Sequence, residues 1–597
     1  MALSISFSHS SLFSSKKFSQ TCDPLARPLQ NLHVTSQHVR LFFCSSLVSQ
    51  FTAAARRSGN YQPSIWDNDF VQSLKTDFTG ERYVRWAKKL GEEVRRKFNE
   101  VAEPLALLEL IDTVERLGMG YHFQTEIKGA LETIISIKDN NFCAGEEIYA
   151  QALRFRLLRQ HGFQVSQDVF KSFKEEVGDG YFTFGGPVCK DIRTILSLYE
   201  ASYYAFEGES ILDEAQRFTR RQLKKKLKEN IAPDLTREIS HAMELPLHWR
   251  MQRMEARWFL DTYGMREDMD PLLLKFAKLD FNLVQATHQE DLKHVSRWWN
   301  NLGLGKALSF SRDWLVECFL FTVGAMFQPE FGFGRRQLTK AVSLINVIDD
   351  VYDIYGSLDE LQLFTEAVQR WDINNLQDLP EYMQICFMAL YNTTNELAYD
   401  FLKEHGHDIL KYLKKEWVDL CKAYLVEAMW HHNGYKPTLE EYMNNAWISV
   451  GLPLVLTQNY LCSSRDNITK EALEQLGKYS NIIRSSSLIF RFADDFGTSS
   501  DELRRGDVPK SIQCYMHDTD CSEEIAREHI RALVAKTWKQ MNEHASAPFP
   551  PLFITSAVNF AQTALFMYQY RDGHGVADWK LKDGIMSLLV EPISLMV

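Results

Sequence analysis

The chain has 597 residues, of which 45% are apolar, 24% are charged and 12% are aromatic, and this composition excludes a disordered or fibrous protein. Its formal net charge of −11 argues against a protein that binds nucleic acid without sequence preference, because such proteins carry a basic surface. The ten cysteines are scattered without a C-x-x-C pair, so neither a disulfide framework nor a zinc cluster is expected. No stretch approaches the roughly 18 consecutive apolar residues of a membrane span, so a membrane-spanning helix is not predicted.

Residues 1–55 have a composition of their own, with twelve serines, four basic residues and one acidic residue. Such a serine-rich, acid-poor and basic segment is typical of an organellar transit peptide. A tail without a targeting role is the alternative, and a secretory signal fits less well because no compact apolar stretch with a cleavage site is present. We therefore predict a plastid or mitochondrial transit peptide over residues 1–55.

After residue 56 the apolar residues follow a helical period. In 107–123 and 147–162 they recur at i, i+3, i+4 and i+7, and each pattern ends near a glycine. Convincing alternating strands are not found. We predict an all-α fold with two helical domains, 56–271 and 272–597, joined by a hinge near 265–271. The same helical pattern recurs in segments 191–206, 211–228, 251–263, 271–285 and 290–299.

An acidic motif stands inside the apolar segment 341–356, AVSLINVIDDVYDIYG. Asp349 and Asp353 are four residues apart, so a helix places both carboxylates on one face, next to Asp350. A solvated acidic turn is the ordinary interpretation of such a motif. The surrounding apolar residues weaken that interpretation, because an unpaired carboxylate away from water is costly.

A second set of oxygen ligands lies in segment 482–511. Asp494, Thr498 and Glu502 are spaced by four residues and share one helix face, which Arg491 joins. A surface ion pair between Arg491 and Asp494 is the alternative. Carboxylates and a hydroxyl without nearby histidine or cysteine suit Mg²⁺ or Mn²⁺ better than Zn²⁺.

Magnesium ions held in this way would form a cationic platform for a diphosphate, and basic side chains would complete it. A P-loop, H-E-x-x-H, G-x-S-x-G and the dinucleotide fingerprint are all absent from the sequence. Segment 504–511, with its glycine and proline, is predicted to be a loop that acts as a lid. The candidate diphosphate-binding residues are Arg312, Arg491, Arg504, Arg505 and Lys510.

Three motifs in this order resemble one family. They are RRSGNYQPSIW at 56–66, DDVYD at 349–353 and DDFGTSSDE at 494–502. Over residues 56–597 the chain resembles the plant class I terpene synthases, specifically the plastidial monoterpene synthases. The resemblance implies a catalytically silent, α-barrel-like N-terminal domain and a C-terminal class I helical bundle that holds the active site.

The resemblance also implies roles for individual residues. It makes the tandem Arg56–Arg57 important for isomerising the substrate or for capping the closed site. It implies about three Mg²⁺ or Mn²⁺ ions per site. The implied metal ligands are Asp349 and Asp353 on one wall and Asp494, Thr498 and Glu502 on the other. The implied diphosphate-binding residues are Arg312, Arg491 and Lys510, and the implied catalytic residues are Asp349, Asp350, Asp353, Arg312 and Arg491, with Asp350 supporting its motif.

The expected activity is the metal-dependent ionisation of geranyl diphosphate to a cyclic or acyclic monoterpene, hydrocarbon or alcohol, by a lyase. Alternatives are a sesquiterpene synthase that uses farnesyl diphosphate and a noncatalytic helical protein that binds a prenyl diphosphate. We expect a monomer whose partner is the small-molecule substrate geranyl diphosphate. Binding to nucleic acid and a membrane span are not expected. Aromatic walls would stabilise a carbocation. Plain core packing is the interpretation we favour for any single one of the candidates, which are Trp314, Phe321, Tyr424, Trp447, Tyr515 and Tyr568.

Two positions depart from the family pattern. Trp314 stands where the family usually has an arginine, and Phe321 stands where it usually has tryptophan. We expect the first change to weaken diphosphate capture and the second to affect the product. Restoring arginine at position 314 is then expected to lower the substrate KM.

Overall fold

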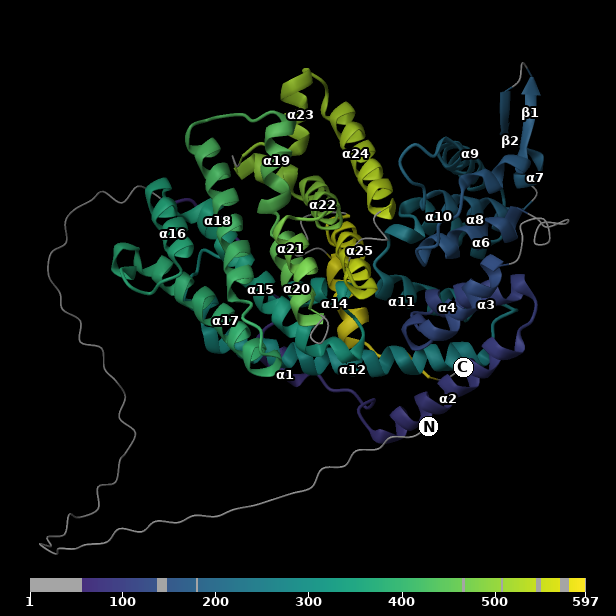
Figure 1. Cartoon of the computed structure of the whole chain (residues 1–597), viewed down its shortest axis with the longest axis horizontal. Coiled ribbons are helices and arrows are strands. Elements are labelled where there is room, and N and C mark those ends of the chain that lie inside the picture. The colour runs from purple at the N-terminus through teal and green to yellow at the C-terminus, as the bar shows by residue number, and fades with distance from the viewer. Residues whose placement is uncertain are drawn as a thin grey trace, which may run out of the picture. The chain divides into compact units, whose positions relative to one another are not determined.

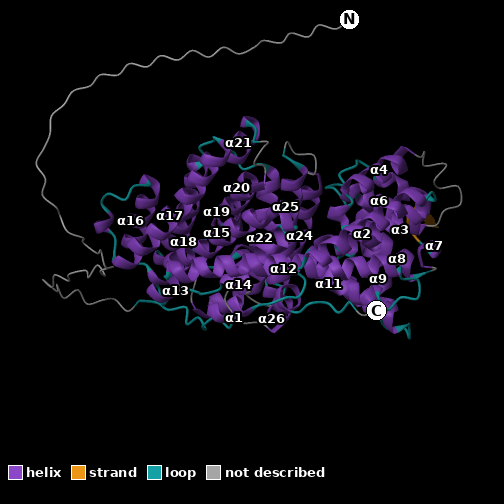
Figure 2. Cartoon of the chain, turned by 90° about the horizontal axis from the view of Figure 1, so that it is seen from below, coloured by secondary structure: helices purple, strands orange, loops and turns teal. Residues whose placement is uncertain are grey.

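The computed structural model describes residues 56–136, 148–178, 181–189, 191–463, 468–505, 508–543, 549–569 and 579–595. These residues belong to one compact unit, Ala55–Val597. Helices make up nearly all of its regular structure, which confirms the predicted all-α fold (Figure 2). The predicted transit peptide at 1–55 lies outside the described residues.

The N-terminal half of the unit consists of short helices (Figure 1). They are α1 (Asn68–Ser73), α2 (Glu81–Glu100), α3 (Pro104–Arg116), η1 (Gly120–His122), α4 (Gln124–Ser136), α6 (Ile148–Gln160), η2 (Gln167–Phe173), α7 (Gly186–Cys189), α8 (Ile192–Ser202), α9 (Ser210–Lys226), α10 (Pro233–Glu244), η3 (Leu247–Trp249) and α11 (Gln252–Tyr263).

Longer helices form the C-terminal half. They are α12 (Pro271–Leu302), α13 (Leu304–Ala307), α14 (Leu315–Ala325), η4 (Pro329–Phe331), α15 (Gly332–Asp350), the π-helical turn η5 (Val351–Tyr355), α16 (Leu358–Arg370), η6 (Leu376–Asp378), α17 (Glu381–His405), α18 (Leu410–His432), α19 (Leu439–Ser449), α20 (Leu452–Ser463), α21 (Lys470–Gly477), α22 (Asn481–Arg505), α23 (Ser511–Thr519), α24 (Glu523–Glu543), α25 (Pro551–Met567), α26 (Trp579–Ile585) and the π-helical turn η8 (Met586–Val590).

Helix α12 shows how local sequence determines an element. The Asp270 carboxylate caps its first turn by accepting from the backbone N–H of Leu272 at 2.8 Å, and Pro271 takes the first helical position, where no N–H is needed. The helix ends at Gly303, whose φ of 73° is left-handed. Segments 271–285 and 290–299 were predicted separately, but both belong to this one helix. No helix-breaking glycine or proline lies between them.

A short hairpin was not predicted from the sequence. Strand β1 (Lys174–Gly178) pairs antiparallel with β2 (Tyr181–Phe184). Each strand has only a few residues, too few for a convincing alternation of apolar and polar positions. The hairpin lies beside α7 and α9 (Figure 1), and it does not alter the helical class.

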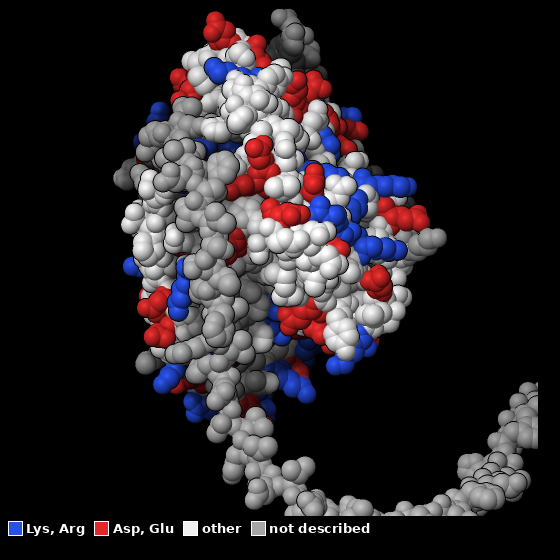
Figure 3. All heavy atoms as spheres, turned by 90° about the vertical axis from the view of Figure 1, so that its left-hand side faces the viewer, with Lys and Arg blue, Asp and Glu red and all other residues white. Residues whose placement is uncertain are grey.

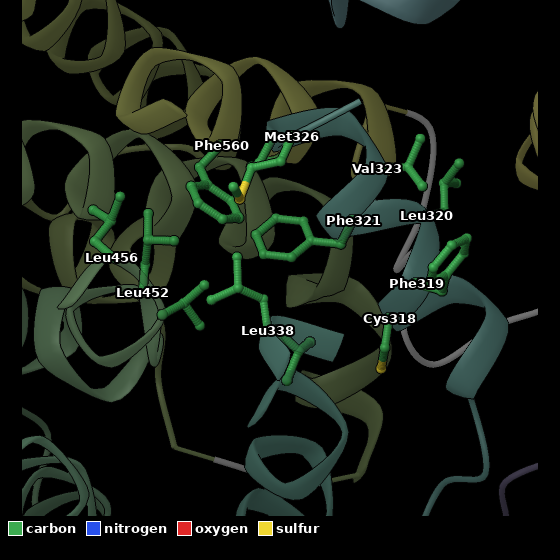
Figure 4. Packing of buried hydrophobic residues seen from close by; sticks show 14 of the residues in the cluster. Cys318, Phe319, Leu320, Phe321, Val323, Met326, Leu338, Leu452, Leu456 and Phe560 are labelled. Carbon is green, nitrogen blue, oxygen red and sulfur yellow. The ribbon is translucent and has the colours of Figure 1, made fainter. Parts of the chain in front are cut away.

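Besides a small group around Tyr442, Ala446 and Cys514, two larger buried apolar clusters support the described unit. The smaller of these two joins α6, α8, α9 and α10. The larger one includes residues from α1 to η8 and surrounds Phe321 of α14, whose ring points toward Phe560 of α25 (Figure 4). Among the described helices, none combines the length and apolar character that a membrane crossing requires. On the face shown in Figure 3, basic and acidic side chains are interspersed.

Candidate functional site

One pocket collects most of the residues that the sequence singled out. It encloses about 870 Å³ of space, its open mouth and the solvent there included. Its walls come from α14, α15, η5, α18, α20, α22 and the loop before α23. The predicted site residues that line it are Arg312, Asp349, Asp353, Arg491, Asp494, Thr498 and Lys510.

The first wall is formed where α15 passes into the π-helical turn η5. Asp349 is in the last turn of α15 and Asp353 is in η5, and both line the pocket as predicted. A π-helical turn adds a residue to the helical repeat and is frequent at functional sites. The backbone carbonyl of Asp353 accepts a hydrogen bond from Arg57 at 3.0 Å, which joins this wall to the N-terminal segment.

Arg312 is held between two acids of the same motif. Its guanidinium donates to Asp349 and lies 3.0 Å from an oxygen of Asp350. Asp350 is completely buried, accepts from the Ser311 hydroxyl and the Arg312 backbone N–H, and does not line the pocket. Burial raises the pKa of Asp350, and the adjacent guanidinium opposes that rise. The position of Asp350 suits orienting Arg312, which agrees with the predicted support of its motif, and its catalytic role stays a prediction.

The second wall is helix α22. Asp494 and Thr498 line the pocket from successive turns, and Arg491 pairs with Asp494 as the alternative interpretation expected, though in the pocket rather than at the surface. Arg491 also lies 2.8 Å from an oxygen of the fully buried Asp495. The side chain of Glu502, the third predicted ligand here, lies outside the described residues.

Lys510 reaches the pocket from the residue that precedes α23. Its ammonium group lies 3.7 Å from a carboxylate oxygen of Glu427 on α18, and both side chains are buried. The side chains of Arg504 and Arg505 are not among those described, and neither is residue 506 of the predicted lid loop.

The N-terminal strap, defined here as residues 56–66, contacts the same wall. Arg56 donates to both carboxylate oxygens of Glu360 at 2.8 and 2.9 Å and lies over the ring of Tyr355. Glu360 also accepts from the backbone N–H of Ser357 and so caps α16. One glutamate therefore determines the start of α16 and the position of the strap.

Tyr61 of the strap lines the pocket, and sequence reasoning missed it. The Arg312 guanidinium lies 5.3 Å from the centre of its ring. The tyrosine lies within the quoted 56–66 motif, but nothing in its spacing shows that the strap reaches a pocket formed some 250 residues later. Asn346 and Ser449 also line the pocket and were also missed. The sequence did offer a signal for Ser449. The glycine and proline at 451 and 453 indicate a helix break, and Ser449 is the last residue of α19 before that break.

The other half of the pocket is apolar and aromatic. Phe321, Tyr424 and Tyr568 line it as predicted, together with Phe490. The ring centres of Phe321 and Phe490 are 5.3 Å apart, and those of Phe490 and Tyr568 are 5.8 Å apart, both in edge-to-face arrangements. Burial, together with the carboxylates of the first wall, raises the pKa of Tyr424, so the phenol stays neutral.

Three of the candidate aromatic wall residues are not among those that line this pocket, as the core-packing interpretation expected. Trp447 packs against Tyr479, and Tyr515 stacks on His529 at 4.0 Å. Trp314 is buried and lines a second, smaller hollow between the strap, α14 and α26. Helical spacing indicated that these rings are buried but not which cavity they face. The effect of Trp314 on KM stays a prediction.

The donor set of the two walls fits a hard divalent cation. Asp349, Asp353 and Asp494 supply carboxylate oxygens, and the buried hydroxyl of Thr498 has no hydrogen-bond partner among the described residues. Such an orphaned oxygen beside carboxylates is available for Mg²⁺. No group of three His, Cys, Asp or Glu side chains converges on one point in the described part of the chain. Asp349 and Asp353 instead line the pocket from α15 and η5, and Asp494 and Thr498 line it from α22.

Two family models match the chain. Residues 65–243 match the N-terminal domain of terpene synthases, and residues 300–540 match the metal binding domain of the terpene synthase family. The (−)-α-terpineol synthase of Vitis vinifera is 54% identical over 90% of this chain and 91% of its own length. The chloroplastic myrcene synthase of Quercus ilex is 51% identical over 96% of this chain and 94% of its own.

Solved structures agree with these relatives. A limonene synthase bound to 2-fluorolinalyl diphosphate superimposes with a TM-score of 0.87 at 42% identity, over 90% of this chain and 100% of that one. An isoprene synthase from grey poplar, with three Mg²⁺ ions and dimethylallyl-S-thiolodiphosphate, gives 0.82 at 45%, over 89% and 99%. The chain therefore belongs to the terpene synthase family, and it is an enzyme of the lyase class whose relatives are plant monoterpene synthases.

Proposed function

We propose that this protein is a monoterpene synthase that ionises geranyl diphosphate, releases diphosphate and converts the allylic cation into a monoterpene. The observation that carries the proposal is a single pocket with a charged half and an aromatic half. A prenyl diphosphate has the same division between an anionic head and an apolar tail. The C–O bond to the diphosphate breaks, and the resulting cation either loses a proton to give a hydrocarbon or takes up water and then loses a proton to give an alcohol.

The charged half binds the head group. Arg312, Arg491 and Lys510 are the cations that approach the departing diphosphate, where preorganised positive charge stabilises developing negative charge. Asp349 and Asp353 hold metal on one wall, and Asp494, Thr498 and Glu502 hold metal on the other. Three Mg²⁺ or Mn²⁺ ions, when bound, supply the further positive charge that makes diphosphate a good leaving group.

The aromatic half receives the hydrocarbon chain. The edge-to-face rings of Phe321, Phe490 and Tyr568 present π-electron density to a cation and exclude water from it. Tyr424 stays neutral and adds a phenol at the boundary between the halves. The strap reaches the charged half through Tyr61, whose aromatic ring lies beside Arg312.

We also propose how the chain is organised and located. Residues 1–55 are a transit peptide, 56–271 form the catalytically silent helical domain, and 272–597 form the catalytic bundle. The mature protein acts as a monomer in the chloroplast stroma. Its relatives from Quercus ilex and Litsea cubeba are named as chloroplastic, which supports the location.

Product analysis tests the proposal directly. The chain without residues 1–55 is incubated with Mg²⁺ and either geranyl or farnesyl diphosphate, and the volatile products are identified. We expect monoterpenes from geranyl diphosphate, and none in a control treated with a chelator. Volatiles no higher than in that control would contradict the proposal, and a higher kcat/KM for farnesyl diphosphate would make the protein a sesquiterpene synthase instead.

A further inference from the structure

Each cation of the proposed diphosphate site contacts a buried carboxylate that does not itself line the pocket. A long basic side chain has many rotamers, so a fixed anion behind it restricts where its charge can lie. Two of these anions belong to the acidic motifs, and the third lies on a different helix. The pairs are Arg312 with Asp350, Arg491 with Asp495 and Lys510 with Glu427.

Glu427 is the carboxylate that no motif predicts. It lies on α18 and is only 3% exposed. One oxygen accepts from the Asn445 amide at 3.1 Å and from the Ser449 hydroxyl, and the other lies 3.7 Å from the Lys510 ammonium. These three partners come from α19 and from the residue before α23.

The partners of Glu427 connect two parts of the pocket. Lys510 lines the charged half, and Ser449 lines the wall where α19 ends before α20 begins. Gly451, with a φ of 77°, makes this break, and a side chain at that position would contact Ile345 of the opposite helix at about 3.1 Å. The Glu427 carboxylate therefore contacts both Lys510, a cation of the proposed diphosphate site, and Ser449, which lies at the break between α19 and α20.

We infer that Glu427 is a positioning residue for this reaction, one that acts through Lys510 on the diphosphate and through Ser449 on the pocket wall. The inference rests on the proposed function. A carboxylate removed from water is costly unless it is paired and hydrogen-bonded, and the three contacts supply that pairing. In return, the Lys510 ammonium is held at the pocket before the substrate arrives.

A purely structural role is the competing explanation, and the chain offers a matched control. Glu416 lies on the same helix and is equally buried, but its contacts are Lys415 and Tyr479, neither of which lines the pocket. Replacing either glutamate by glutamine keeps its size and its ability to accept hydrogen bonds. Only Glu427→Gln removes an ion pair with a pocket cation.

The experiment is a double-mutant cycle between Glu427→Gln and Lys510→Met, with Glu416→Gln as the control. We measure kcat and KM for geranyl diphosphate, the Kd of inorganic diphosphate with Mg²⁺ by calorimetry, and Tm. We expect Glu427→Gln to lower kcat/KM about tenfold or more, as loss of a supporting partner typically does, and to weaken diphosphate binding. In the Lys510→Met background the same change should have little further effect on either quantity.

A second variant separates the two contacts of Glu427. Ser449→Ala keeps the ion pair with Lys510 and removes one hydrogen bond, so we expect altered product ratios with diphosphate affinity unchanged. Additive effects of Glu427→Gln and Lys510→Met, or an effect of Glu427→Gln on Tm alone equal to that of Glu416→Gln, would overturn the inference. A wild-type enzyme that forms no terpene would instead contradict the proposed function, so the two failures are distinguishable.

Discussion

Single side chains on α14 differ in function although they are equally buried. Phe321 packs at 5.1 Å from Phe560 and at 5.3 Å from Phe490, and it lines the pocket. Phe319 is two residues away and fully buried, and its side chain points away from Phe321 (Figure 4). Because both rings fill core space, both support the fold, but only one shapes the space in which a cation reacts.

Replacing these two phenylalanines by alanine separates stability from product control. We expect Phe321→Ala and Phe319→Ala each to lower the free energy of unfolding by about 3–5 kcal/mol, the usual cost of a large-to-small change in a core. Only Phe321→Ala should change the ratio of terpene products, because only it enlarges the reacting cavity. Chemical denaturation and chromatography of the volatiles measure the two effects. A changed ratio in Phe319→Ala of the same size would contradict this assignment.

At the scale of elements, a buried bond anchors the strap to α14. The Trp66 indole N–H donates to Glu317 at 2.9 Å, and Glu317 is 4% exposed. Trp66 is the last residue of the 56–66 motif, so this bond gives the tryptophan of that motif a physical role. Burial raises the pKa of Glu317 to about 7, and the Trp66 N–H opposes this rise only in part.

The raised pKa of Glu317 predicts a pH dependence of stability. Between the ordinary glutamate pKa, about 4.5, and about 7, the folded state binds this proton more tightly than the unfolded state. The contribution of Glu317 to stability is therefore complete below about pH 4.5 and declines as the pH rises to about 7. We expect the Tm of the wild type, relative to that of Glu317→Gln, to fall over this window. The control is Glu290→Gln, at an exposed position. The Tm difference between the wild type and Glu290→Gln should stay constant over this pH window. A change in that difference as large as the one for Glu317→Gln would refute the explanation.

Local sequence predicted the elements better than it predicted their long-range contacts. The aspartate, proline and glycine that bound α12, and the spacing of Asp349 and Asp353, are local signals, and the structure agrees with them. Tyr61 and Glu427 were missed because their partners are distant in sequence and no local pattern records such contacts. For the same reason the sequence did not decide whether Trp447 faces the pocket or the core. Its burial follows from helical period, but its neighbour depends on packing.

At the scale of the whole molecule, the chain has a net charge of −11 and gathers several carboxylates in one pocket. The question is what keeps the protein folded against the repulsion between these carboxylates. Like charges four residues apart repel, yet Asp349 is paired with Arg312 and Asp494 with Arg491. The large apolar cluster reaches from α1 to η8 without involving these acids. The fold therefore depends on packing, and the proposed metal ligands Asp349 and Asp494 are paired with the cations that the proposed function assigns to diphosphate.

This arrangement predicts that metal ions and diphosphate stabilise the protein only together. Chelator-treated protein should keep its helical circular dichroism and its Tm, because arginines already compensate the carboxylates. Mg²⁺ with inorganic diphosphate, at about 100 times the Kd, should add about 2.7 kcal/mol of stability and raise Tm by roughly 2 °C. Asp349→Asn should abolish both this rise and turnover while it leaves the circular dichroism unchanged, whereas Asp378→Asn, at an exposed position, should preserve all three. Loss of helical signal on chelation would mean that the metal is structural, because a fold held by packing alone would not respond to its removal.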